Sequence, residues 1–376
     1  MRILYFVCLC LLALPIKAQD EEQGKNLSFV LKPNGHKGLI QDLSLTPDGK
    51  QIITSGRDKT VRIWDVDSYE QRSEILGHVG GENYGAIYSA RISPDGKYMA
   101  TAGLFGDSND LKYLADIRIY DFSTQKIVHV FDGHKMSINT LRWSSDSKYL
   151  ISASNDNNVG VWDVKNFQPK SMLKGHGDAV WCAVVFGDKV VSGSQDNLVH
   201  LYDLNTGTLL NSSYDHVGIV IRVAFHPSGK YILSGADDNQ INIYNAELKF
   251  LSSVFLDQTP STITFDQAGK LALIGFNNGS IKIYQFDQGK LTETATYQPH
   301  EGAFVAGIEI TPDRRIFSAG GTGSNIAVYQ YKDGKVDSLT NIGGSTQKVW
   351  GAGLNDNLLA FSTGSKPWGH ITGLRD

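Results

Sequence analysis

An all-β fold built from a repeat of about 42 residues is what the sequence predicts, on three observations. The chain has 39 glycines and only 10 prolines among 376 residues, with 16 tyrosines and 16 phenylalanines, a composition that favours short strands joined by tight turns. Histidines recur at steps of 42 residues, as from His36 to His78. A Trp-Asp pair recurs in the same frame, as at Trp64 and Trp162.

The charge balance excludes one class of function. Lys and Arg number 35 against 39 Asp and Glu, for a net charge of -4, whereas nucleic-acid-binding proteins normally carry a basic excess. Charged residues make up 20% and aromatic residues 10% of the chain, which indicates a globular protein rather than a disordered one. We therefore expect a folded chain that does not bind nucleic acid.

Residues 1–18 have the layout of a secretory signal peptide. Arg2 precedes an apolar run over residues 3–14, and the small Ala18 ends the segment. A membrane anchor, the alternative, needs about 20 apolar residues to cross the bilayer. We therefore predict cleavage after Ala18, a secreted or periplasmic location, and no membrane span in the mature chain. Residues 19–26 would then form a linker.

Cysteine usage agrees with a fold that is stabilised by packing. Cys8 and Cys10 lie in the predicted signal peptide, so the mature chain would retain only Cys182 and could form no internal disulfide. The apolar neighbours of Cys182, from Val180 to Val184, indicate a small buried hydrophobic residue rather than a nucleophile.

Seven repeat starts can be located along the chain. Six of them carry a histidine, in most cases after glycine: His36, His78, His134, His176, His216 and His300. The double step from His216 to His300 predicts a repeat without histidine near residue 258, and residues 262–284 have the expected outline. The long step from His78 to His134 contains two insertions, over residues 79–85 and 104–113.

Each repeat is expected to contain four strands. In the first repeat they cover residues 39–45, 51–55, 61–66 and 70–76, and Pro47-Asp48-Gly49-Lys50 forms the first turn. The third strands end in an aromatic residue and a polar one, at Trp64-Asp65, Tyr120-Asp121, Trp162-Asp163, Tyr202-Asp203, Tyr244-Asn245, Tyr284-Gln285 and Tyr329-Gln330.

With its Gly-His starts, Trp-Asp ends and a period of about 40–45 residues, the chain resembles the WD-repeat (Trp-Asp repeat) β-propeller family over residues 27–376. The resemblance implies a single all-β propeller domain. An eighth repeat would start near Ile342, and the remaining residues would form strands over 349–354, 357–363 and 369–374. The strand Leu27–Leu31 would complete that C-terminal blade and close the ring. We therefore predict eight blades; seven is the alternative, because the last unit lacks both the histidine and the Trp-Asp ending.

Four repeats carry a histidine, a hydroxyl residue, an aspartate and an aromatic residue at regular spacing. They are His36, Thr54, Asp58 and Trp64; His134, Ser152, Asp156 and Trp162; His176, Ser192, Asp196 and Tyr202; and His216, Ser234, Asp238 and Tyr244. These are the residue types of a hydrolase triad, but hydrolysis needs a single exposed nucleophile beside an oxyanion hole. The resemblance implies instead a structural network in which the aspartate accepts from histidine and the aromatic residue satisfies the hydroxyl.

The resemblance also implies where partners bind. In this family the partner-binding positions lie near the start of each first strand, around the channel opening on the top face. Spacing from the histidines places Gln41, Tyr88, Asn139, Trp181, Ile221, Ser261, a position near Phe304–Val305, and Trp350 there. The predicted partner-binding residues come from these positions and from the two insertions. They are Tyr84, Tyr88, Phe105, Trp181, Ile221, Phe304 and Trp350. The alternative is that these side chains pack against one another and plug the channel.

The predicted function is a non-catalytic interaction module that binds a peptide or protein loop on its top face. Its partner would be an envelope or extracellular protein, and the chain itself is expected to be a monomer. We expect no cofactor and no metal, since histidines from different blades cannot meet as a zinc site. Two alternatives stay open: a periplasmic propeller enzyme (a quinoprotein-like dehydrogenase, lactonase or lyase) and a purely structural envelope protein. An enzyme would need convergent titratable residues at the channel mouth.

Overall fold

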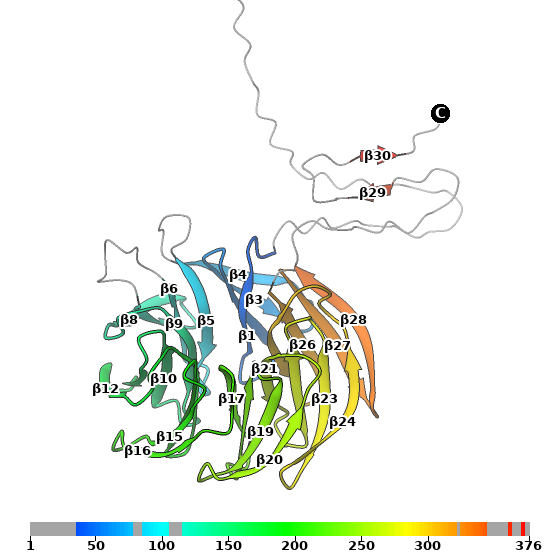
Figure 1. Ribbon diagram of the computed structural model, residues 1–376. Coiled ribbons are helices and arrows are strands. Elements are labelled where there is room, and N and C mark those ends of the chain that lie inside the picture. The colour runs from blue at the N-terminus through cyan, green and yellow to red at the C-terminus, as the bar shows by residue number, and fades with distance from the viewer. Residues whose placement is uncertain are drawn as a thin grey trace, which may run out of the picture. The chain divides into compact units, whose positions relative to one another are not determined.

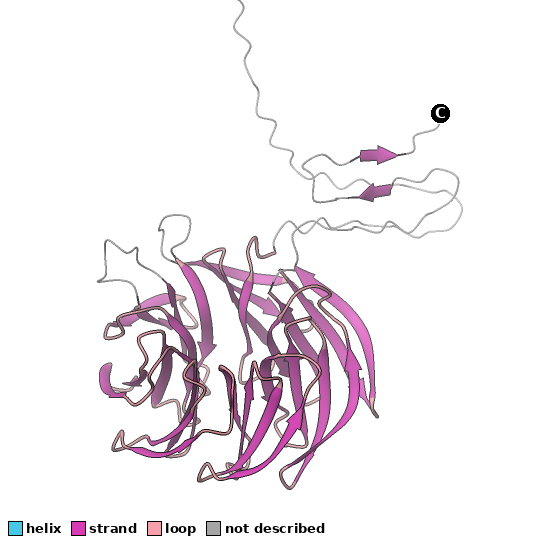
Figure 2. Cartoon of the chain, in the orientation of Figure 1, coloured by secondary structure: helices cyan, strands magenta, loops and turns pink. Residues whose placement is uncertain are grey.

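A computed structural model of the chain describes residues 35–77, 85–104, 115–321, 324–343, 360–362 and 370–372. All of them belong to the compact unit Asn34–Asp376. The described residues contain strands and turns and no helix, as Figure 2 shows, so none of them forms a helix able to cross a membrane. Seven sheets have four antiparallel strands each, and one has two.

Each four-stranded sheet consists of four strands that follow one another in sequence. The first strands are β1 (Ile40–Leu45), β5 (Ala86–Ile92), β9 (Ile138–Trp143), β13 (Val180–Phe186), β17 (Val220–Phe225), β21 (Pro260–Phe265) and β25 (Val305–Ile310). The second strands are β2 (Gln51–Gly56), β6 (Tyr98–Leu104), β10 (Tyr149–Ser154), β14 (Lys189–Ser194), β18 (Tyr231–Ala236), β22 (Leu271–Phe276) and β26 (Arg315–Gly320).

The other two strands complete each sheet. The third strands are β3 (Thr60–Asp65), β7 (Ile117–Asp121), β11 (Val159–Asp163), β15 (Val199–Asp203), β19 (Gln240–Asn245), β23 (Ile281–Asp287) and β27 (Asn325–Lys332). The fourth strands are β4 (Gln71–Leu76), β8 (Lys126–Phe131), β12 (Gln168–Leu173), β16 (Leu209–Ser213), β20 (Phe250–Phe255), β24 (Lys290–Tyr297) and β28 (Lys335–Gly343). The two-stranded sheet pairs β29 (Ala360–Ser362) with β30 (His370–Thr372).

The seven four-stranded sheets are the blades of a β-propeller. Each first strand contacts the first strand of the next blade, and β25 contacts β1, so the seven first strands form a closed ring around a central channel. The first blade lies beside the seventh in Figure 1, blue against orange. The second strands are almost entirely buried, whereas fourth strands such as β4 alternate between half-buried and exposed residues. The first strands are therefore innermost and the fourth strands outermost.

The hydrophobic core is divided among the seven spaces between neighbouring blades. Each space holds one cluster of buried side chains contributed by two successive blades. The cluster that closes the ring joins Ile40, Leu43 and Trp64 of the first blade to Phe317 and Val328 of the seventh. Because these two blades pack directly on each other, there is no space for another blade between them.

The expectation of eight blades is therefore wrong, and the alternative of seven is correct. The seventh blade has its own outermost strand, β28, so it is complete with four strands. Two of the strands expected after residue 345 overlap β29 and β30, but these pair with each other in the two-stranded sheet. The strand expected at Leu27–Leu31 lies outside the described residues. The residue count misled because enough chain for three strands does not by itself make a blade.

Candidate functional site at the central channel

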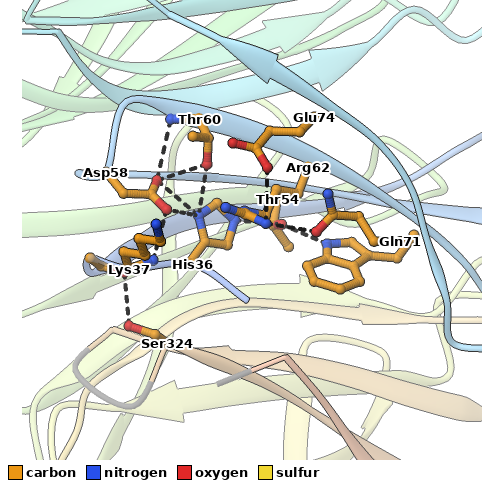
Figure 3. Close-up of polar contacts among 11 residues, drawn as sticks. His36, Lys37, Thr54, Asp58, Thr60, Arg62, Gln71, Glu74 and Ser324 are labelled. Carbon is orange, nitrogen blue, oxygen red and sulfur yellow. Dashed lines mark hydrogen bonds and ion pairs between the residues drawn. The ribbon is translucent and has the colours of Figure 1, made fainter. Parts of the chain in front are cut away.

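The network predicted from the four regular repeats joins the loop before each innermost strand to the second and third strands. In the first blade, His36 Nδ1 lies 3.0 Å from Asp58 Oδ1, and His36 Nε2 lies 2.8 Å from Thr54 Oγ1 (Figure 3). Trp64 Nε1 donates to the same hydroxyl oxygen at 2.9 Å. The matching His–Asp and His–Ser distances in the other three blades are 2.8–2.9 Å and 2.6–2.7 Å.

The carboxylate of Asp58 fixes the position of each proton in this network. An ionised carboxylate can only accept, so His36 Nδ1 carries a proton and donates it to Asp58. In the neutral ring, Nε2 then accepts from the Thr54 hydroxyl, whose oxygen accepts from the indole of Trp64. This is the pattern of a hydrolase triad, but Thr54, Ser152, Ser192 and Ser234 all have 0% exposure. Because no substrate can reach these hydroxyls, the arrangement serves to hold the strands together.

The aspartates also hold the histidine loops in place. The backbone N–H of Lys135 donates to Asp156 at 2.8 Å, and Lys37, Gly177 and Val217 do the same in their blades. Burial alone would raise the pKa of Asp156, but the hydrogen bond and charge of His134 together with the Lys135 N–H lower it to about 2. The carboxylate is therefore ionised at all physiological pH values.

The two tyrosines of the network bond differently from the two tryptophans. Tyr202 Oη lies 3.0 Å from His200 Nδ1, and Ser213 Oγ donates to Tyr244 Oη at 3.0 Å. The His200 ring in turn stacks on His176, with centroids 3.9 Å apart. A phenol can both donate and accept, so these tyrosines reach partners beyond the hydroxyl that the sequence pattern assigns to them.

The seventh blade contains an incomplete version of the network. His300 Nε2 lies 2.9 Å from Ser318 Oγ, but the residue that follows His300 at the spacing of the aspartates is Thr322. Among the described residues, His300 Nδ1 has no hydrogen-bond partner, although the side chain of Asn325 lies near enough to favour the charged ring. Burial dominates and lowers the pKa of His300 to about 4.

We expect His300 to make the protein less stable in weak acid. Its pKa is about 4 in the folded state and near the usual 6.5 in the unfolded chain, so unfolding takes up a proton between these values. The free energy of unfolding should therefore fall as the pH is lowered from 6.5 towards 4. Urea denaturation at several pH values should give a shallower fall for His300→Gln than for the parent. Identical pH slopes would contradict the assignment.

The predicted partner-binding positions coincide with a recurrent irregularity of the innermost strands. In every blade the pairing between the first and second strands shifts by one residue near the start of the first strand, which marks a β-bulge. The residues inserted at these bulges, here named the entrance ring, are Gln41, Tyr88, Asn139, Trp181, Ile221, Ser261 and Ala306. Six of the seven are positions that the histidine spacing identifies.

Tyr88, Trp181 and Ile221 are each half-buried in this ring. Asn139, whose blade lies between those of Tyr88 and Trp181, donates to the side-chain oxygen of Asn155 at 2.7 Å and to the backbone carbonyl of Val180 at 2.9 Å. The entrance ring is therefore partly apolar and partly held by hydrogen bonds.

Phe304 does not belong to the entrance ring. The loop after His300 is one residue longer than the loops after His36, His134, His176 and His216, which moves the equivalent position to Ala306. Phe304 instead packs against the cluster between the seventh and first blades. Its assignment as a ring residue is corrected accordingly. Tyr84, Phe105 and Trp350 lie outside the described residues.

Below the entrance ring, the innermost strands alternate between two environments. The second residue after each bulge enters the core between blades, as Leu43, Leu141 and Val223 do. The first and third residues after the bulge face the channel, which accounts for Arg91, Arg142 and Glu309 in the lining of its cavity. Sequence reasoning missed these channel residues; the period-2 alternation after each bulge was the available signal.

The channel holds a buried ionic cluster across the join of the ring. Arg91 of β5 donates to both carboxylate oxygens of Asp42 on β1, and its Nη1 lies 3.0 Å from Glu309 Oε1 on β25. Ser89 also donates to Asp42 at 2.7 Å. Burial alone would lower the pKa of Arg91, but the two carboxylates raise it above its usual value. Arg91 thus connects the second blade to the first and the seventh.

Two further features bear on chemistry. Cys182 is 3% exposed, and burial raises the pKa of its thiol to about 11, so it is not a poised nucleophile. In the described part of the chain, no three His, Cys, Asp or Glu side chains are grouped so as to bind a metal ion.

Comparison with known proteins agrees with this architecture. The sequence profile of the family described as "WD domain, G-beta repeat" matches residues 27–65, 125–163, 167–203 and 207–245. The last three segments each begin near the outermost strand of one blade and end with the third strand of the next. The crystal structure of the RRP9 WD40 repeats superposes with a TM-score of 0.67 at 20% identity, covering 77% of this chain and 89% of that chain.

The chain matches different shares of the length of its curated relatives. The chain is 24% identical over 335 residues to rat apoptotic protease-activating factor 1, covering 76% of this chain and 26% of that protein. It is 23% identical over 269 residues to a guanine nucleotide-binding protein subunit beta of Oryza sativa, covering 66% and 69%. A CCR4-associated factor 4 homolog of Candida glabrata is 34% identical over 228 residues, covering 52% and 38%.

The chain thus spans about a quarter of the length of the rat protein. Seven four-stranded blades, the histidine–hydroxyl–aspartate network in four of them and the matched repeat profile all point to the same architecture. The chain belongs to the WD-repeat β-propeller family.

Proposed function

We propose that this propeller is a non-catalytic interaction module that binds a peptide or loop of another protein at the entrance ring. The observation that carries the proposal is the placement of Tyr88, Trp181 and Ile221 at bulge positions of one ring. Each is half-buried, so part of each side chain stays accessible at the channel opening. Aromatic residues at the centre of an interface supply much of its binding energy.

The network supports a binding role over a catalytic one. The four hydroxyls that resemble triad nucleophiles are completely buried, and the carboxylates in the channel are both paired with Arg91. The relatives support the same role, since two of their names describe a subunit and an associated factor. A rigid ring whose chemistry is used for its own stability leaves its loops and opening for recognition.

The proposal includes export across a membrane. The support is the N-terminal pattern: Arg2, the apolar run over residues 3–14 and Ala18. The partner would then be an envelope or extracellular protein, and the mature chain would begin at Gln19.

The double substitution Tyr88→Ala and Trp181→Ala should weaken partner capture at least tenfold, which corresponds to about 1.4 kcal/mol. The measurement is affinity capture by the tagged protein from the medium and envelope fraction of its own cells, with retained proteins quantified by mass spectrometry. The matched control is Phe250→Ala, since Phe250 is 47% exposed on the outermost strand β20, away from the channel.

The expected result is loss of a specific retained protein in the double variant but not in the control. Equal retention by both variants and the parent would place the binding surface elsewhere on the propeller. Retention lost equally in both variants would indicate a general loss of folding, which circular dichroism would detect.

A further inference from the structure

The channel contains a cavity of about 300 Å³ below the entrance ring. Its wall includes the charged side chains of Arg91, Arg142 and Glu309. Most other residues of the wall are apolar, with Val184, Phe225 and Phe265 among them, and the hydroxyl residues Thr262 and Thr264 are also present, but polar atoms make up the larger share of the exposed wall. The innermost strands of six blades contribute to it: β5, β9, β13, β17, β21 and β25.

Arg142 lacks the acidic partner that Arg91 has. Among the described residues, its guanidinium donates one hydrogen bond, from Nη1 to the carbonyl of Leu141 at 2.8 Å. Burial, together with the positive charge of Arg91, lowers the pKa of Arg142 to about 10. A guanidinium has five N–H donors, so most of the donors of Arg142 have no acceptor among the described residues.

Arg222 is a further cation of the channel, and it lies closer to the entrance ring along its strand than Arg142 does. It follows the bulge of β17 by one residue, and its Nη1 donates to the carbonyl of Ile221 at 2.9 Å. Burial lowers the pKa of Arg222, and its charge contributes to the lowering at Arg142. Among the described residues, the channel thus holds three arginines against two carboxylates, Asp42 and Glu309, which leaves one positive charge without compensation.

Arg142 is half-buried, so its guanidinium has lost part of its water without gaining a counter-charge, and this partial desolvation is costly. The planar fork of an arginine matches a carboxylate in a bidentate pair. An anion of charge −1 would balance the channel, whereas a phosphate dianion would overcompensate it. The apolar side chains in one part of the wall and the small volume suit a compact hydrophobic body attached to that charge.

We propose that the channel is a binding site for a small organic monocarboxylate, whose carboxylate pairs with Arg142 while its apolar body packs against Val184, Phe225 and Phe265. The hydroxyls of Thr262 and Thr264 lie in the same wall and can donate to the ligand. This site is separate from the protein-binding entrance ring, so it does not depend on the function proposed above.

Benzoate is a suitable probe, since it combines a single carboxylate with a compact apolar ring. Isothermal titration calorimetry at pH 7 and constant chloride should detect benzoate binding to the full-length mature protein. Arg142→Met should weaken this binding at least tenfold, and Arg142→Lys, which keeps the charge without the fork, should weaken it less. The matched control is Arg57→Met, because Arg57 is an exposed arginine in the turn after β2.

Two comparisons with the unaltered protein keep the proposal testable even if the Arg142 variants do not fold. Benzyl alcohol, the neutral counterpart, should bind at least tenfold more weakly than benzoate. Inorganic phosphate at equal concentration should not compete with benzoate. Binding of benzyl alcohol as tight as that of benzoate, full competition by phosphate, or unchanged benzoate binding by a folded Arg142→Met protein would each overturn the proposal.

Discussion

Replacing Arg91 with Met is expected to lower the free energy of unfolding by about 3–5 kcal/mol. The substitution keeps most of the side-chain volume but removes the cation that pairs with both Asp42 and Glu309. The carboxylates of Asp42, which is buried, and Glu309, which is half-buried, would then lose their shared cation where the first and seventh blades meet. Their mutual repulsion would act directly on the contact that closes the ring.

The measurement is urea denaturation followed by tryptophan fluorescence, with Arg72→Met as the matched control. Arg72 pairs with Asp65 at 2.7 Å, but its side chain is 54% exposed, so the control should cost less than about 1 kcal/mol. Adding Asp42→Asn and Glu309→Gln to Arg91→Met should restore part of the loss, because the unpaired charges are then gone. An Arg91→Met protein as stable as the control would show that the ring closes without this cluster.

Replacing Asp156 with Ala should lower the free energy of unfolding by about 1–3 kcal/mol. Asp156 accepts from His134 Nδ1 at 2.9 Å and from the Lys135 backbone at 2.8 Å, and both donors would lose their partner. The loop that precedes β9 would then be released from the second and third strands of its blade. Asp188→Ala is the control, since Asp188 lies exposed in the turn between β13 and β14.

The effect of Asp156 should also depend on pH in a defined direction. Its pKa is about 2 in the folded state, below the usual 3.8, so its stabilising contribution is complete above about pH 4 and is lost as the pH falls towards 2. The stability difference between the parent and Asp156→Ala should therefore shrink over that range. A variant that kept full stability but lost a hydrolytic activity of the parent would contradict the structural role.

The local features of this fold could be predicted from the sequence because each depends on short separations. The period of the histidines, the Pro47–Lys50 turn and the spacing of Thr54, Asp58 and Trp64 all lie within one repeat. Within a repeat, the antiparallel pairing of consecutive strands places residues at fixed offsets opposite one another. The same offsets located six of the seven bulge positions around the channel.

The features that the sequence did not reveal depend on how the ring closes. Whether the residues after 343 add a blade was decided by direct packing of Ile40 and Leu43 against Phe317 and Val328, which no residue count contains. The displacement of the seventh ring position to Ala306 arose from one extra loop residue, whose effect appears only in the strand register.

The ionic cluster shows most clearly where sequence information ends. In sequence, Asp42, Arg91 and Glu309 are unremarkable charged residues on three strands, and 218 positions separate the last two. The repeat period predicts that these strands exist, but not that their charged side chains face the channel. The tertiary structure brings the three charges within bonding distance, because closing the ring places β25 against β1 and leaves their channel-facing side chains little contact with solvent.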